Sequence, residues 1–137
     1  MKYALKIEKD ADYLLVTMPE IPELTSVAYK EEDIQKECLD AFELTLDFYA
    51  QQNKPIPLPG KVKSGKHALI LPSTLAAKIY LYNEWLNSGI DKGEIAKRMD
   101  VKNSAVSRLF NFKYRSKIDV IEQALATLGK YIEIKVA

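Results

Sequence analysis

The segment KGEIAKRMDVKNSAVSRLFN, residues 92–111, restricts the fold of this chain more than any other stretch. Its apolar residues recur at three- and four-residue steps in two short runs, which predicts helices at about 92–99 and 103–111. The small Ala96 suits a close crossing of these helices, and Val106 follows ten residues later. This spacing predicts a helix-turn-helix.

The turn between the two predicted helices has Asp100 where this motif usually has glycine. The backbone there often needs a positive φ, which Asp adopts at modest cost, so the motif is weakened and not lost. The residues expected to be buried between the helices are Ile95, Ala96, Met99, Val106 and Leu109.

The outward side of the second predicted helix suits DNA recognition, because such a helix places its first outward residues at base edges in the major groove. Asn pairs bidentately with adenine, Arg with guanine, and Ser with either kind of partner. We therefore predict base contacts from Asn103, Ser104 and Arg108, with Ser107 also facing outward. The predicted contacts to phosphates of double-stranded operator DNA, which fix register without reading sequence, are Lys92, Lys102, Asn111, Lys113 and Arg115. A plain helical packing unit with a cationic surface is the alternative interpretation.

Charge is distributed unevenly along the chain, although the net charge is only +1. Residues 1–60 contain six Lys and twelve Asp/Glu, a net charge of −6, whereas residues 92–117 contain eight Lys/Arg and two Asp/Glu, a net charge of +6. A cationic cluster attracts phosphate through counterion release, so this asymmetry suggests two modules with different partners. Charges that merely solvate two faces would give the same totals.

The amino-terminal half predicts a β-β-β-α-β module, and the chain as a whole an α+β fold. The expected elements are a strand over 2–9, a strand over 13–18 that forms a hairpin with it, a short strand near 24–28, a helix over about 30–52 with Phe42 and Phe48 on its apolar stripe, and a strand over 68–71.

The predicted domain boundary lies after residue 71. The first domain, 1–71, includes a connector at 53–67 that is rich in Pro, Gly, Ser and Lys. The second domain, 72–137, has a long predicted helix over 73–87 before the helix-turn-helix and another helix over 117–128 after it.

The carboxyl-terminal tail alternates Tyr131, Glu133 and Lys135 with Ile132, Ile134 and Val136, which predicts a strand over 130–136. Its partner is either a second subunit, which would suit a homodimer or higher oligomer reading a two-fold operator, or the strand's own domain.

Composition excludes several classes of site. No apolar run reaches about 18 residues and the amino terminus is charged, so we expect a cytoplasmic protein with no membrane segment. The single Cys38 and single His67 form no metal-ligand pattern, so we expect neither a metal nor another cofactor. Acidic residues lie on the predicted helix as a solvated face, and Cys38 falls on its apolar stripe, so we expect no catalysis.

Three segments carry a resemblance to a known family: MPEIPEL, DFYAQQNKPIPLP at 47–59, and SRLFNFKYRSKID at 107–119. With these segments the chain resembles the HicB antitoxins of bacterial HicAB toxin-antitoxin systems, in the subgroup with a helix-turn-helix instead of a ribbon-helix-helix. The resemblance implies that the first domain, similar to a partial RNase H-like fold, binds and inhibits a HicA-type mRNA-cleaving toxin. It also implies a phage-repressor-like second domain that represses the protein's own operon.

A different interpretation keeps the DNA-binding function of the second domain but assigns another function to the first domain. The chain would then be a stand-alone helix-turn-helix repressor whose amino-terminal module senses a small ligand or forms oligomers. Nothing in the sequence resembles a polar ligand cradle, yet a pocket between a sheet and a helix leaves no sequence pattern.

Overall fold

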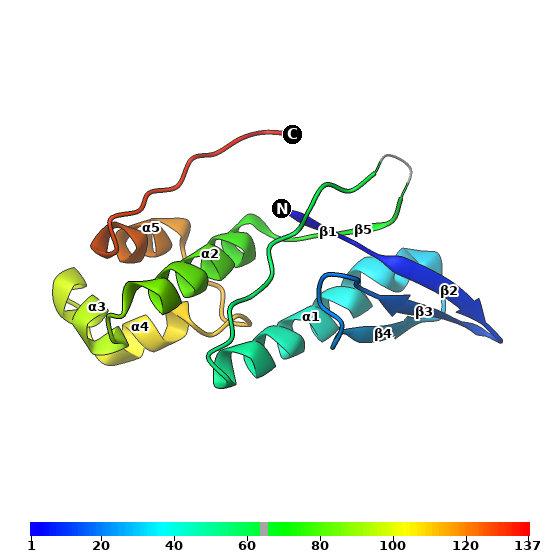
Figure 1. Ribbon diagram of the computed structural model, residues 1–137, viewed down its shortest axis with the longest axis horizontal. Helices are drawn as coiled ribbons and strands as arrows, with labels where there is room; N and C mark the ends of the chain where they lie inside the picture. Colours follow the sequence, from blue (N-terminus) through cyan, green and yellow to red (C-terminus); the bar gives the residue numbers. More distant parts are fainter. Residues whose placement is uncertain (64–65) are drawn as a thin grey trace. The chain divides into compact units, whose positions relative to one another are not determined.

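The structure is a computed structural model that describes residues 1–63 and 66–137. These residues form two compact units, Met1–Leu71 and Pro72–Ala137. Ser64 and Gly65, which belong to the predicted connector, lie outside the described residues. Strands and one long helix make up the first unit and helices the second, so the predicted α+β class is confirmed at this level (Figure 1).

The first unit contains two antiparallel sheets. Its elements in chain order are β1 (Lys2–Ala4), β2 (Lys6–Asp10), β3 (Tyr13–Thr17), β4 (Thr25–Ala28), the short 3-10 helix η1 (Glu31–Asp33), α1 (Ile34–Gln51) and β5 (Ala68–Ile70). Strand β1 pairs with β5, and the other sheet has the order β2-β3-β4. Asp10 lies opposite Tyr13, which confirms the predicted hairpin and leaves Ala11 and Asp12 as its turn.

The single strand predicted over 2–9 is wrong, because the structure divides it at Leu5 into β1 and β2. The backbone N–H of Leu5 donates to the carbonyl of His67 at 2.9 Å, next to the β1–β5 pair, while β2 pairs with β3. Alternation along one run of residues cannot reveal that its two halves have different partners.

Helix α1 packs on β4 and covers one face of the three-stranded sheet. The buried residues of α1 follow one stripe, which includes Phe42 and Leu46. The prediction for Phe48 is wrong, since its side chain is exposed. At 100° per residue, Phe48 is one step off the stripe that Leu46 and Tyr49 occupy.

Side-chain hydrogen bonds join α1 to β5 and β1 to the connector within the first unit. The amide of Gln35 on α1 donates to the carbonyl of Ala68 and accepts from the N–H of Ile70, at 2.5 and 3.1 Å, and so pairs with the edge of β5. The described part of the predicted connector contains no helix or strand, but it is packed: Ile56 is buried, and the hydroxyl of Tyr3 donates to the carbonyl of Pro57 at 2.7 Å.

The described residues of the second unit form four helices. They are α2 (Ser73–Ser88), α3 (Lys92–Met99), α4 (Asn103–Leu109) and α5 (Ile118–Thr127), close to the predicted ranges. Helix α2 packs on α5, and α3 packs on both α4 and α5. In the part of the chain that the structure describes, no helix has the length and apolar character needed to span a bilayer.

The strand predicted over 130–136 is absent, because the tail after α5 is extended but unpaired in the single chain (Figure 1). A strand needs a neighbouring strand to satisfy its backbone groups.

Candidate nucleic-acid interface

Helices α3 and α4 are joined by a tight turn, and each end of α3 has a defined cap. The carboxylate of Asp91 accepts the backbone N–H of Glu94 at 2.7 Å at the start of α3. At its end Asp100 is left-handed, with φ 55° and ψ 50°, and the N–H of Val101 donates to the carbonyl of Ala96 at 3.0 Å. The positive φ expected at this turn is therefore confirmed at Asp100.

This conformation gives a first prediction for stability. Asp100→Gly is expected to be between neutral and about 1 kcal/mol more stable, since glycine adopts the left-handed region without strain but gains entropy in the unfolded chain. Asp100→Val is expected to cost about 1–2 kcal/mol, because a β-branched residue is strained there. Urea unfolding followed by tryptophan fluorescence measures both; a more stable Val variant would contradict the turn geometry.

The helices meet along the predicted packing side. Ile95, Ala96, Val106 and Leu109 are buried, and Met99 is half-buried. All nine residues predicted for nucleic-acid contact are exposed, and they are Lys92, Lys102, Asn103, Ser104, Ser107, Arg108, Asn111, Lys113 and Arg115. The apolar and polar positions of α3 and α4 are thus on separate sides.

The loop that follows α4 has its own order. The side-chain oxygen of Asn111 accepts the backbone N–H of Lys113 at 3.1 Å, which fixes the loop locally and leaves the Asn111 amide nitrogen as a donor. The guanidinium of Arg108 lies 5.6 Å from the ring centre of Tyr114, a cation–π contact that restricts its direction. These two contacts order the end of α4 and the loop that follows it.

Lys92, at the start of α3, lies in an aromatic environment that the sequence did not predict. Its ammonium is 4.8 Å from the ring of Trp85 and 4.7 Å from the ring of Phe110. Burial of this ammonium lowers the pKa of Lys92. The two rings hold the Lys92 ammonium beside the end of α4. Lys92 is one of the residues predicted to contact phosphates.

Lys78 on α2 is the residue that sequence reasoning missed. Its side chain is 1% exposed, and its ammonium donates to the carbonyls of Arg108 at 3.1 Å, Asn111 at 2.9 Å and Tyr114. Lysine is seldom fully buried, so no general pattern predicts this position. Its one sequence signal is a lone charge inside the apolar run AAKIYLY.

The environment of Lys78 is unusual because the charge has acceptors but no counter-ion. Among the described residues, no carboxylate oxygen lies within 4.0 Å of the Lys78 ammonium, and the ring centre of Tyr114 is 5.5 Å away from it. Burial lowers the pKa of Lys78 to about 8. Lys78 thus caps the carboxyl-terminal end of α4 and fixes the loop that carries the predicted contacts.

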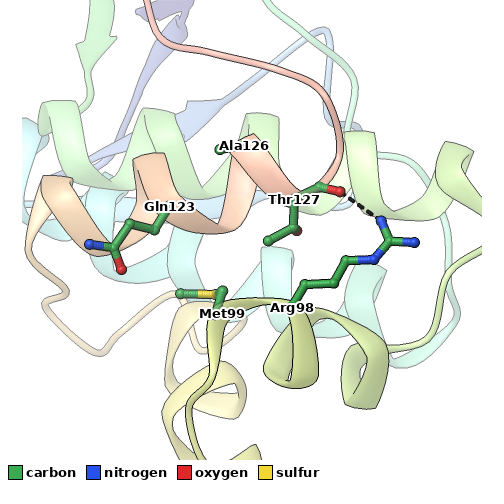
Figure 2. A pocket seen from close by; sticks show the side chains of 5 residues that line it. All are labelled: Arg98, Met99, Gln123, Ala126 and Thr127. Carbon is green, nitrogen blue, oxygen red and sulfur yellow. Dashed lines mark hydrogen bonds between the residues drawn. The ribbon is translucent and has the colours of Figure 1, made fainter.

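A shallow depression of about 430 Å³ lies between the end of α3 and α5 (Figure 2). Its lining residues are Arg98, Met99, Gln123, Ala126 and Thr127. The guanidinium of Arg98 is already occupied, because it donates to the Glu94 carboxylate at 3.1 Å and to the Thr127 carbonyl at 2.8 Å. In this depression Arg98 therefore links α3 to α5, and its lining offers no convergent polar groups for a small ligand.

Comparison with known proteins adds an independent finding. Residues 2–80 match the family described as HicB_like antitoxin of bacterial toxin-antitoxin system. The chain is 33% identical over 136 residues to Antitoxin HicB of Pseudomonas fluorescens, which covers 98% of this chain and 93% of the relative. It is 30% identical over 138 residues to Antitoxin HicB 1 of Photorhabdus laumondii, covering 99% and 87%. Antitoxin HicB of Escherichia coli K12 is 32% identical over 120 residues, covering 88% and 87%.

Proposed function

Because the chain belongs to the HicB family of bacterial antitoxins, we propose that it neutralises a HicA-type mRNA-cleaving toxin through its first unit and represses its own operon through the second. The observation that carries the proposal is the family match over residues 2–80, which includes all of the first unit except Met1. Membership of an antitoxin family also means that the protein is not an enzyme.

Charge supports the assignment of the toxin to the first unit. Residues 1–60 have a net charge of −6, and a toxin that binds RNA needs a cationic surface. Complementary potentials of this kind speed association and favour the correct partner. Val27 is exposed on the side of the three-stranded sheet opposite the buried Val16 and Ala28, and Tyr29, just after β4, is exposed as well. Both offer apolar contact area within this acidic unit.

The arrangement of α3 and α4 supports repression through DNA. We propose that α4 enters the major groove with Asn103, Ser104 and Arg108 at base edges, while Lys92, Lys102, Ser107, Asn111 and Lys113 flank it toward the phosphates. In this proposal the second unit is a phage-repressor-like domain, the first a partial RNase H-like fold, and the repressor a homo-oligomer on its operator.

The test is co-expression with the small open reading frame next to the gene. We expect that frame to arrest growth alone, and this protein to restore growth and to co-purify with its product. The matched control is the variant with alanine at Asn103, Ser104 and Arg108, which should rescue equally because it alters only the second unit. Failure of rescue and of complex formation would overturn the antitoxin role and leave a stand-alone repressor with a sensing or oligomerisation module as the function to test.

A further inference from the structure

Three backbone carbonyls at the end of α4 converge on one point inside the second unit. They belong to Arg108, Asn111 and Tyr114, and all three accept hydrogen bonds from the Lys78 ammonium. The chain between them makes two successive turns, because the N–H of Asn111 donates to the carbonyl of Arg108 at 3.2 Å and the N–H of Tyr114 to that of Asn111 at 3.1 Å. Carbonyl oxygens that point toward one another repel unless a cation lies between them, so this backbone conformation depends on the charge of Lys78.

The backbone held in this way carries side chains that we predicted to contact DNA. They are Arg108, Asn111 and Lys113, and all three are exposed. The ring of Tyr114 adds a side-chain link, since its centre lies 5.5 Å from the Lys78 ammonium and 5.6 Å from the Arg108 guanidinium. Lys78 itself is only 1% exposed. It is therefore connected to the predicted DNA contacts although it is too buried to touch DNA.

We infer that Lys78 is a positioning residue of the DNA interface: its buried ammonium fixes residues 108–114, and through them the directions of Arg108 and Asn111 toward DNA. The inference rests on the proposed function, because that function assigns these two side chains to operator contacts. An ammonium has three N–H donors, one for each carbonyl. A neutral amine has two N–H bonds and a lone pair, so it leaves one carbonyl without a donor. The neutral form of Lys78 therefore does not hold the same conformation.

The charge of Lys78 titrates in an accessible range, because burial lowers its pKa to about 8. Besides the guanidinium and the tyrosine ring described above, helix α5 packs on α2 and carries Asp119 and Glu122, but neither carboxylate lies within 4.0 Å of the ammonium. On α2 itself Tyr82 is buried, which raises its pKa above 10.0. DNA phosphates favour the charged form of Lys78, so promoter binding should take up a proton near pH 8.

The pH profile of promoter preference tests the inference on the native full chain. The quantity measured is the ratio of the affinities for the protein's own promoter and for unrelated DNA, from pH 7 to pH 9, one unit on each side of the pKa of Lys78. We expect this ratio to fall about fivefold in the native protein, and by less than about twofold, from a lower starting value, in Lys78→Met. Lys92→Met is the matched control and should keep the native profile, because it removes a predicted phosphate contact whose lowered pKa affects both DNAs alike.

The stability of the fold changes in the opposite direction, which separates positioning from a merely structural role. A neutral Lys78 costs less to bury, so the native protein gains stability relative to Lys78→Met as the pH rises through 8. A falling promoter preference therefore does not come from unfolding, and tryptophan fluorescence shows that each variant is folded at the temperature used. A native ratio that stays constant from pH 7 to pH 9, or one that falls equally in Lys78→Met, would overturn the inference.

A measurement without DNA keeps the inference separate from the proposed repression. In the free full-length protein, the NMR signals of the Asn111 and Tyr114 backbone amides should shift with a midpoint near pH 8, and they should not do so in Lys78→Met. Amides that do not respond in the native protein would overturn the inference. Amides that respond in a protein without any promoter preference would count against the proposed repression and not against the control of this loop by Lys78.

Discussion

Lys78→Met is expected to destabilise the second unit by about 2–4 kcal/mol. The variant keeps an apolar stem of about the same length but removes the ammonium group that donates to the carbonyls of Arg108, Asn111 and Tyr114. Hydrogen bonds from a charged donor contribute about 1.5–3 kcal/mol each, and relief from burying an ammonium offsets part of their loss. For a unit of this size the melting temperature should fall by about 8–32 °C.

The measurement can be confined to the unit in question. Trp85 is the only tryptophan of the chain, and its ring packs 5.2 Å from that of Phe110 at the end of α4. Urea unfolding of the full chain followed by tryptophan fluorescence therefore reports on the second unit. Lys97→Met, the same change at an exposed lysine of α3, is the matched control and should alter the free energy of unfolding by less than about 0.5 kcal/mol. Equal stability of the two variants would show that the three carbonyls do not need Lys78.

The pH dependence of this stability has a definite sign. The pKa of Lys78 falls from 10.5 to about 8 in the folded chain, so the unfolded chain binds more protons between these values. The native protein should therefore gain stability relative to Lys78→Met as the pH rises from 8 to 10.5, by at most about 1.4 kcal/mol per pH unit. Lys92, whose pKa is also lowered by burial, is present in both proteins and cancels in the difference. A difference that stays constant over this range would exclude titration of Lys78.

Much of the second unit was predictable because helical periodicity is a local property. The burial of Ile95, Val106 and Leu109 follows from their spacing, and the left-handed turn follows from the helix-turn-helix motif, in which this position usually needs a positive φ. Lys78 was not predictable, since its burial depends on carbonyls thirty or more residues away that converge only in the folded unit. The aromatic pair around Lys92 has the same origin.

In the first unit the errors came from partners that are distant along the chain. The split at Leu5 depends on the pairing of β1 with β5, more than sixty residues later, which alternation within 2–9 does not encode. The exposed Phe48 shows that three- and four-residue steps can continue a stripe in two directions, and the sheet beneath α1 selects only one. The tail is not a strand within its own chain for the same reason, because its pattern has no partner there.

Alanine at Asn103, Ser104 and Arg108 together is expected to weaken binding to the protein's own promoter at least about 100-fold. Each bidentate base contact favours the correct base over a wrong one by about 1–3 kcal/mol. The free energies of two such contacts and one serine contact add, so their effects on the binding affinity multiply. The second unit should stay folded, because all three side chains are exposed and alanine favours a helix; only the contact of Arg108 with Tyr114 is lost. The unfolding curve from Trp85 checks this point.

Lys113→Ala is the matched control for that variant, because it alters a predicted phosphate contact and no base contact. It should weaken binding to all DNA sequences alike and reduce the slope of log affinity against log salt by about one. The triple variant should instead lose the difference between promoter and unrelated DNA while keeping nearly the native salt slope. The sequence preference and the salt slope therefore distinguish base recognition from electrostatic binding to phosphates. Promoter binding that survives the triple substitution would show that α4 is not the recognition helix. Rescue of growth from the toxin should be unchanged in both variants, since the residues lie outside the first unit.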